Sequence, residues 1–216
     1  MTAALEEGLR RGAQSLGLVL DEAQIRQLLD YQALIQKWNK VYNLTAVRDP
    51  AEMLTHHLLD SLAVISPLRR QARVPARLLD VGSGAGLPGV VIAICCPEWG
   101  VDCVDAVAKK AAFIQQVAVS LKLPNLRGLH QRVETLSGRY DLISSRAFAS
   151  LADFIAGSRE VLAPEGVWMA MKGKLPEAEM AALPAGVEVF HVEQLQVPGL
   201  DADRCIVWLR RTPVVT

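Results

Sequence analysis

An acidic residue and three glycines near the middle of the chain have the types and spacing of a ligand-binding turn. Asp80 is followed at alternate positions by Gly82, Gly84 and Gly86, with one apolar run before them and another after. This pattern predicts a buried strand, a glycine turn and a helix in succession. Glycine is used in such a turn because a Cβ would block a close ligand or the required backbone angles. The turn and the helix N-terminus would then present backbone N–H groups to the ligand.

Two classes of cofactor fit this turn. Residues 84–89 match the dinucleotide pattern G-x-G-x-x-G, and residues 80–86 match the D-x-G-x-G-x-G pattern of S-adenosyl-L-methionine sites. Because the predicted strand ends at Val81, the dinucleotide window begins two residues late. The Asp80 carboxylate can receive the ammonium of the methionine part, whereas it would repel a pyrophosphate. The turn therefore favours S-adenosyl-L-methionine, with NAD and a turn without ligand as the alternatives.

The elements that must position this turn alternate from residue 77 onward. Strands are expected at 78–81, 101–105, 126–130, 140–145 and 167–171, with helices between them. Two further strands, 187–195 and 205–210, are joined by a loop alone, which implies antiparallel pairing. The predicted fold class is α/β: a Rossmann-like class I methyltransferase fold with a mostly parallel seven-stranded sheet and an antiparallel C-terminal strand. An antiparallel C-terminal pair of strands is not expected in a standard dinucleotide-binding domain.

The first part of the chain has a different architecture. Residues 1–20 read as a modest helix at best, Asp21 as an N-cap, and 22–40 as an amphipathic helix. Another helix is expected from Asp49-Pro50 through Ile65, before a basic linker at 69–73. We therefore expect an N-terminal helical cap over residues 1–66 and a methyltransferase domain over 67–216.

Composition limits the partners and the compartment. The chain has 216 residues, with Lys+Arg and Asp+Glu both at 23, so a nucleic-acid partner is expected only through a local patch. No apolar run reaches transmembrane length and the N-terminus lacks a signal-peptide layout, so we expect a cytoplasmic protein without a membrane partner. The cysteines have no metal-ligand spacing and read as buried thiols in a reducing compartment; they are Cys95, Cys96, Cys103 and Cys205. We therefore expect no metal.

Ligands in open α/β sheets bind at the carboxyl ends of the strands. Asp105 ends the second predicted strand, about 20 residues after the turn, where an acid is expected to take ribose hydroxyls. It could also cap the next helix, and both roles can hold. Val133 and Glu134 follow the third strand. They could meet the face and the amino edge of an adenine, or form a plain surface loop, and the residues alone leave both readings open.

Arg146 follows the fourth strand, in the segment Ser144–Phe148. That segment contains neither the D/N-P-P-Y motif of amino-group methylation nor the Pro-Cys nucleophile of cytosine C5 chemistry. A nucleophile with a free lone pair, such as guanine N7, needs no base, and positioning alone can supply up to about 7–11 kcal/mol. The Arg146 fork can hold a phosphate or a base edge, or it can form an ion pair with Asp141 or Glu160.

These residues, with others along the chain, resemble the RsmG (GidB) family of bacterial 16S rRNA guanine-N7 methyltransferases. The similar segments are 38–45, 48–50, 57–61, 80–89, 132–134, 145–149 and 195–198. The resemblance implies methyl transfer from S-adenosyl-L-methionine to N7 of one guanine in small-subunit rRNA, near the decoding centre, without a dedicated general base. It implies cofactor contacts at Gly82, Leu87, Val133, Glu134 and Arg146. The turn adds Asp80 and Gly84 to these, and the end of the second strand adds Asp105.

The partner implied is 16S rRNA, the 30S subunit or its precursor, with no obligate protein partner. The basic residues that could hold RNA are Lys37, Lys40, Arg48, His56, His57, Lys109, Lys110 and Lys172. Of these we predict substrate contacts for Arg48, His57 and Lys172, together with Arg146. His57 reads equally as a histidine buried between cap and core. Tyr42 and Phe148 could stack on a flipped base, although core packing suits Phe148 better.

Other functions fit parts of these patterns. An NAD-linked oxidoreductase would use the 84–89 window, and a non-enzymatic module could bind cofactor or RNA without turnover. A methyltransferase of another RNA or of a small molecule is a further alternative, because a helical cap could close over a small substrate.

Overall fold

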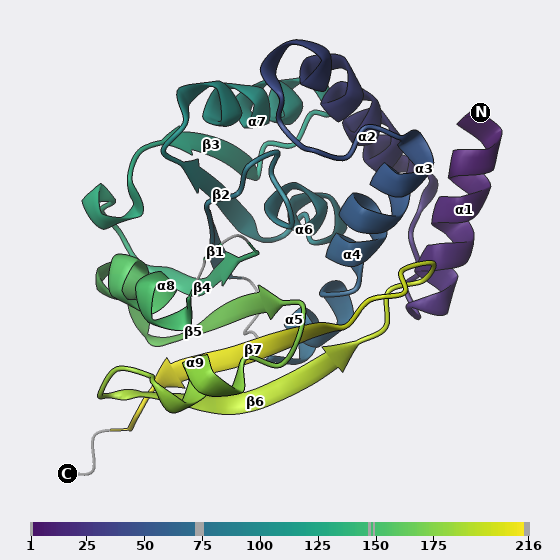
Figure 1. The fold of residues 1–216 in the computed structure, drawn as a ribbon. Helices are drawn as coiled ribbons and strands as arrows, with labels where there is room; N and C mark the ends of the chain where they lie inside the picture. The colour runs from purple at the N-terminus through teal and green to yellow at the C-terminus, as the bar shows by residue number, and fades with distance from the viewer. Residues whose placement is uncertain (1, 72–75, 147, 149, 214–216) are drawn as a thin grey trace.

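The computed structural model describes residues 2–71, 76–146, 148 and 150–213, and within them one seven-stranded sheet. The strand order is β3-β2-β1-β4-β5-β7-β6 (Figure 1). The strands are β1 Arg77–Val81, β2 Gly100–Asp105, β3 Leu126–His130, β4 Tyr140–Ser145, β5 Leu162–Lys172, β6 Val187–Leu195 and β7 Arg204–Arg211. Strands β1 to β5 pair in parallel, and β7 pairs antiparallel with both β5 and β6. The predicted fold class is confirmed.

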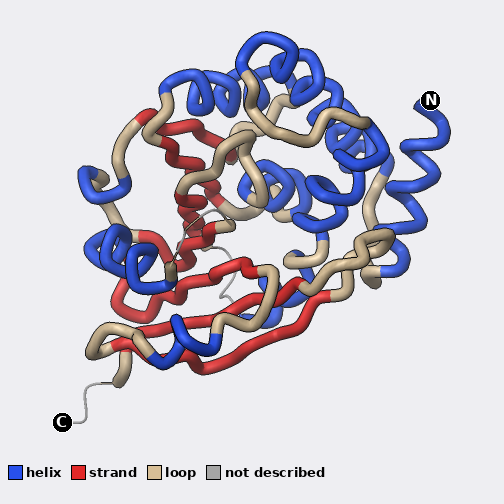
Figure 2. Tube along the Cα trace, viewed as in Figure 1, coloured by secondary structure: helices blue, strands red, loops and turns tan. Residues whose placement is uncertain are grey.

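Helices cover both faces of this sheet (Figures 1 and 2). Before β1 come α1 Thr2–Ser15, α2 Glu22–Tyr42, α3 Pro50–Met53, the π-helical turn η1 Leu54–Leu59, α4 Asp60–Leu62 and α5 Ile65–Gln71. Between the strands lie α6 Gly89–Cys95, α7 Ala108–Ser120, η2 Val133–Thr135, α8 Leu151–Ser158, η3 Arg159–Val161 and α9 Glu177–Ala181. The larger core joins the N-terminal helices, α6 and α7 to one face, and a smaller core packs α8 against the other.

The helix starts follow their predicted caps. The Asp21 side chain accepts a hydrogen bond from the Gln24 N–H, and the Gln24 side-chain oxygen accepts one from the Asp21 N–H, so a capping box opens α2. The Asp49 side chain accepts from the N–H groups of Ala51 and Glu52 at the start of α3, with Pro50 at the first helical position.

Several boundaries differ from the prediction. Helix α1 is a regular helix because Leu9 and Ala13 are buried in the larger core. Helix α5 runs into the expected linker, since Pro67 occupies its first turn, where a missing N–H costs no helical bond; residues 72–75 lie outside the described residues. Strand β5 begins at Leu162, earlier than the expected 167, and a register shift opposite Tyr140 and Leu142 absorbs the added residues as a bulge. Helix α9 was not predicted.

The boundary at residue 66 crosses a continuous core. Leu9 of α1, Leu28 of α2 and Ile92 of α6 belong to the same buried cluster as Trp208 of β7. Helix α2 packs against both α6 and α7, which lie directly on the sheet. The division into a helical cap and a methyltransferase domain therefore stays a prediction.

Candidate functional site

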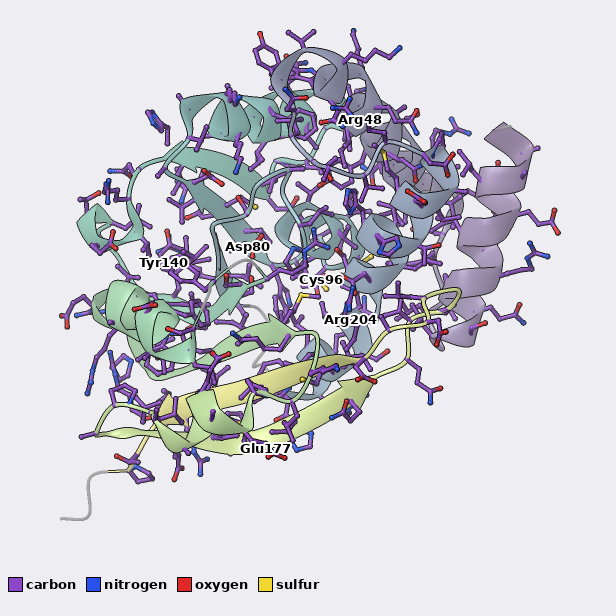
Figure 3. All side chains as sticks on the ribbon, viewed as in Figure 1. Arg48, Asp80, Cys96, Tyr140, Glu177 and Arg204 are labelled. Carbon is purple, nitrogen blue, oxygen red and sulfur yellow. The ribbon has the colours of Figure 1, made fainter. Side chains whose placement is uncertain are left out.

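The glycine turn follows β1, and the buried Asp80 side chain at the end of that strand connects it to its neighbours. Asp80 is fully buried (Figure 3); its Oδ1 accepts from the Ser144 hydroxyl of β4 at 2.7 Å, and its Oδ2 accepts from the Gly89 N–H at 3.0 Å. Burial, the largest effect, raises the Asp80 pKa to about 6. Both oxygens thus fix the turn and α6 to the sheet, and Asp80 offers no exposed surface to a ligand.

Asp105 ties the glycine turn to the end of β2. Its Oδ2 accepts from the Gly84 N–H at 3.0 Å, and its Oδ1 accepts from the Val107 N–H at 2.8 Å. Lys110 lies 3.7 Å from the same carboxylate. The second bond is a local turn bond before α7, although the residue at the N-cap itself is Val107. Asp105 is therefore not the N-cap of α7.

Two hollows adjoin at Gly82. The first, about 160 Å³, is lined by Gly82, Asp105, Glu134, Phe148 and the buried Val133, among others. It brings together residues that follow β1, β2, β3 and β4, as expected for the carboxyl edge of a parallel sheet. The polar side chains come from the end of β2 and the segment after β3, and apolar side chains come from β1, β2, η2 and the segment after β4.

The second hollow, about 150 Å³, is lined by the turn itself and by the N-terminal part of the chain. Gly82, Gly84 and Leu87 form one wall, and His57, Lys110 and Arg146 contribute side chains from three other elements. Gly82 adopts a left-handed backbone conformation with φ +64°, which favours glycine. Of the eight predicted cofactor residues, Asp80 alone lines neither hollow, because it lies beneath the turn.

A third hollow, about 380 Å³, adjoins the second through Arg146. Its lining is basic: His56, Arg146, Lys172 and Arg204 contribute to it, together with Asp60. Figure 3 shows Arg204 where β7 approaches the N-terminal helices. Arg146 therefore lines both the second and the third hollow. This position is compatible with a cofactor contact and with a substrate contact, the two predicted for it.

Asp60 pairs with two arginines in this third hollow. Arg146 Nη1 lies 3.1 Å from Asp60 Oδ2, and Arg204 Nε lies 2.8 Å from Oδ1. The sequence prediction missed both Asp60 and Arg204, and named Asp141 and Glu160 as the partners of Arg146. Asp141 instead accepts from the Arg77 N–H. No local sequence signal joins positions that stand 144 residues apart.

The remaining predicted substrate residues are placed differently. Lys172 donates to both Glu179 oxygens, at 2.9 and 3.1 Å. His57 is buried, its Nε2 lies 2.9 Å from the Thr45 hydroxyl, and burial, the largest effect, lowers its pKa. His57 is therefore buried, but it also lines the second hollow, so its substrate contact stays a prediction. Arg48 is exposed, bonded to Asn43 at 3.0 Å, and lies outside the three hollows (Figure 3).

The aromatic residues divide as the sequence indicated. Phe148 packs against Phe154 of α8, with ring centroids 5.5 Å apart, while it also lines the first hollow. Tyr42 is 40% exposed and packs on Trp38 at 5.1 Å between ring centroids, away from the hollows. A stacking role for Tyr42 stays a prediction.

Within the described ranges, no helix is both long and apolar enough to cross a membrane. The same residues contain no group of three or more His, Cys, Asp or Glu side chains placed to hold a metal ion. All four cysteines are free and buried.

Solved structures share this fold. A SAM-dependent methyltransferase from Aquifex aeolicus superposes with a TM-score of 0.58 at 17% identity, covering 77% of this chain and 96% of that chain. A Burkholderia thailandensis N1-methyltransferase solved with S-adenosylhomocysteine superposes with a TM-score of 0.57 at 17% identity. The superposition covers 85% of this chain and 90% of that chain. The sheet order and these likenesses show that the chain has the Rossmann-like methyltransferase fold.

Sequence comparison is more specific. Residues 24–207 match the GidB family, described as rRNA small subunit methyltransferase G. Two relatives named ribosomal RNA small subunit methyltransferase G are each 69% identical to this chain. The relative from Acidovorax sp. (strain JS42) matches over 96% of both chains. The relative from Polaromonas sp. (strain JS666) matches over 95% of this chain and 93% of its own length. The chain belongs to the GidB family.

Proposed function

We propose that this chain transfers a methyl group from S-adenosyl-L-methionine to N7 of one guanine in 16S rRNA, in the cytoplasm. The observation that carries the proposal is the joining of three hollows through Gly82 and Arg146 in a member of the GidB family. The substrate is naked 16S rRNA, the 30S subunit or its precursor. Four buried free cysteines support a reducing compartment.

The first two hollows fit the two ends of the cofactor. In the first, Val133 and Phe148 offer an apolar surface to a purine, and Asp105 and Glu134 offer acceptors to hydroxyl and amino groups. In the second, Gly82 and Gly84 belong to the turn that leads to α6, and Arg146 can meet a carboxylate. When bound, S-adenosyl-L-methionine supplies an electrophilic methyl carbon on a sulfonium sulfur. We assign Asp80 the role of holding the turn, in place of a direct contact.

The described side chains around the second and third hollows suit a reaction without a general base. Both Asp60 oxygens are occupied by arginines, and His57 bonds to Thr45. Guanine N7 already carries a free lone pair, so these residues need only hold the base and its strand in place. The cap proposed for residues 1–66 contributes His56, His57 and Asp60 to this wall.

The decisive experiment is methyl transfer by the purified protein. 30S subunits and 16S rRNA from cells that lack this protein are incubated with tritiated S-adenosyl-L-methionine, and the labelled nucleotide is mapped. We expect label at N7 of one guanine, and none in subunits from cells that carry the protein. Label at another atom or nucleotide, or cofactor binding without transfer to either substrate, would refute the proposal.

A further inference from the structure

Asp60 forms the centre of an ion cluster that connects three distant parts of the chain. Its side chain is 2% exposed, and it accepts from Arg146, which follows β4, and from Arg204 in β7. Arg146 also donates to the His56 carbonyl at 3.1 Å, and Arg204 to the Asp203 carbonyl at 2.9 Å. Each guanidinium is thus held at two points.

The local helix geometry favours this arrangement. The Asp60 N–H donates to the carbonyls of Thr55 and His57 at the end of the π-helical turn η1. The His56 carbonyl accepts from Arg146. The widened turn therefore places Asp60 and the His56 carbonyl toward one guanidinium, a use of π-turns common at functional sites.

The cluster carries an excess of positive charge on the side that faces the third hollow. One carboxylate is shared by two guanidiniums, while the nearby Lys172 has its own partner in Glu179. The Arg146 and Arg204 side chains remain 28% and 24% exposed, and both line the hollow. A guanidinium has five N–H donors, so each arginine keeps donors beyond those that bind Asp60. Paired forks of this kind match the oxygens of a phosphate.

We propose that Asp60 is a positioning residue that sets Arg146 and Arg204 as a clamp for one backbone phosphate of the substrate RNA. The inference rests on the proposed function and deepens it, because it identifies where the strand beside the target guanosine is held. Arg146 also lines the hollow of the glycine turn, so the clamp lies next to the site of transfer. Asp60 prevents the two like charges from separating before the phosphate arrives.

The chain provides a matched structural carboxylate for comparison. Asp102 in β2 is 4% exposed and accepts from Arg127 Nε and Nη2 at 2.7 and 2.6 Å and from the Tyr140 hydroxyl at 2.7 Å. Arg77 lies 3.6 Å away. Asp102 has the chemistry of Asp60, but it lines none of the three hollows.

The test compares Asp60→Asn with Asp102→Asn in the full chain. For each we would measure the melting temperature, the affinity for S-adenosylhomocysteine, and kcat and KM for unmethylated 30S subunits at a temperature where both variants are folded. Both substitutions should lower the melting temperature. Asp60→Asn should raise KM at least about tenfold, because a misplaced positioning group can cost up to about a hundredfold. Cofactor affinity should fall by a clearly smaller factor, because Arg146 also lines the hollow of the glycine turn. Asp102→Asn should leave KM within about twofold.

Arg204→Lys tests whether the clamp needs the planar guanidinium fork or only a positive charge. It keeps the positive charge but removes the Nε donor and the fork, so KM should rise as it does for Asp60→Asn. The proposal is overturned if Asp60→Asn and Asp102→Asn change KM equally, or if Asp60→Asn weakens cofactor binding as strongly as it weakens RNA binding. A wild-type protein that methylates neither 30S subunits, nor their precursors, nor 16S rRNA contradicts the proposed function instead. The clamp would then be judged by filter binding of 30S subunits, where equal affinity of wild type and Asp60→Asn refutes it.

Discussion

At the scale of single residues, Gly82 combines a left-handed backbone with a position in two hollows. In Gly82→Val the side chain would stand where the cofactor is proposed to lie. We expect binding of S-adenosylhomocysteine, measured by calorimetry, to be lost while the far-ultraviolet circular dichroism of the fold is kept. Retained affinity would remove Gly82 from the site.

The control for that substitution is Gly17→Val in the turn after α1. Gly17 has φ +69° and no atom within 4 Å of an added Cβ, so this variant carries the backbone strain of about 1–2 kcal/mol without touching the hollows. Its melting temperature should fall, and its cofactor affinity should equal that of wild type.

Asp80 makes the stability depend on pH in a direction set by its burial. Its folded pKa of about 6 lies above the ordinary value of 3.8, so the folded state binds this proton more tightly than the unfolded state. The free energy of unfolding of wild type, relative to Asp80→Asn, should therefore be greatest below about pH 4. It should fall by about 3 kcal/mol as the pH rises to about 6 and above. Urea unfolding of both proteins across that range measures the difference, and a constant or rising difference contradicts the assignment.

The residue types of the cofactor hollows could be predicted, but the ion cluster could not. Gly82, Val133 and Glu134 follow strands whose order is implied by their pattern, so the carboxyl edge brings them together. Asp60 and Arg204 meet only because the first residue of α4 lies within hydrogen-bonding distance of the first residue of β7, which no spacing along the chain encodes. Asp80 was predicted as a ligand contact, although the closing of the turn over it assigns it to the interior.

At the scale of elements, the close approach of α6 to the sheet depends on Gly89. A Cβ there would overlap Cys103 Sγ and stand 3.0 Å from the Asp80 side chain. Gly89→Ala should therefore lower the free energy of unfolding by about 1–3 kcal/mol, because a packed core resists added volume. Gly100→Ala at the start of β2, where an added Cβ has no neighbour within 4 Å, should change it by less than about 0.5 kcal/mol. Equal losses in urea unfolding would show that α6 can shift to make room.

Strands were easier to predict than helix interruptions. β3, β4 and β6 have the expected bounds, since short apolar runs between turns leave few alternatives. The expected helix from Asp49 to Ile65 instead contains the π-helical turn η1, whose His56 carbonyl accepts from Arg146 after β4, a contact that no local spacing encodes. The bulge in β5 lies at residues 163–166, where Pro164 and Gly166 are residue types found at bulges.

At the scale of the whole molecule, the N-terminal helices and the sheet share one buried cluster. Leu9 of α1 is fully buried in it, and α1 packs on η1, which carries the wall of the site. Leu9→Ala should therefore lower the free energy of unfolding by about 2–5 kcal/mol by leaving a cavity.

Because the N-terminal helices and the sheet share one core, the loss of stability in Leu9→Ala should affect both parts of the chain together. Because α2 contacts both α6 and α7, loosening of the N-terminal helices exposes the larger core of the sheet as well. Scanning calorimetry of wild type and Leu9→Ala should each show one transition, with equal calorimetric and van't Hoff enthalpies, shifted as a whole to lower temperature in the variant. If residues 1–66 form a separate domain, the trace divides into two transitions and Leu9→Ala moves only the first. In that case the wall that carries Asp60 could open while the sheet stays folded, and RNA binding would be lost at a lower temperature than cofactor binding.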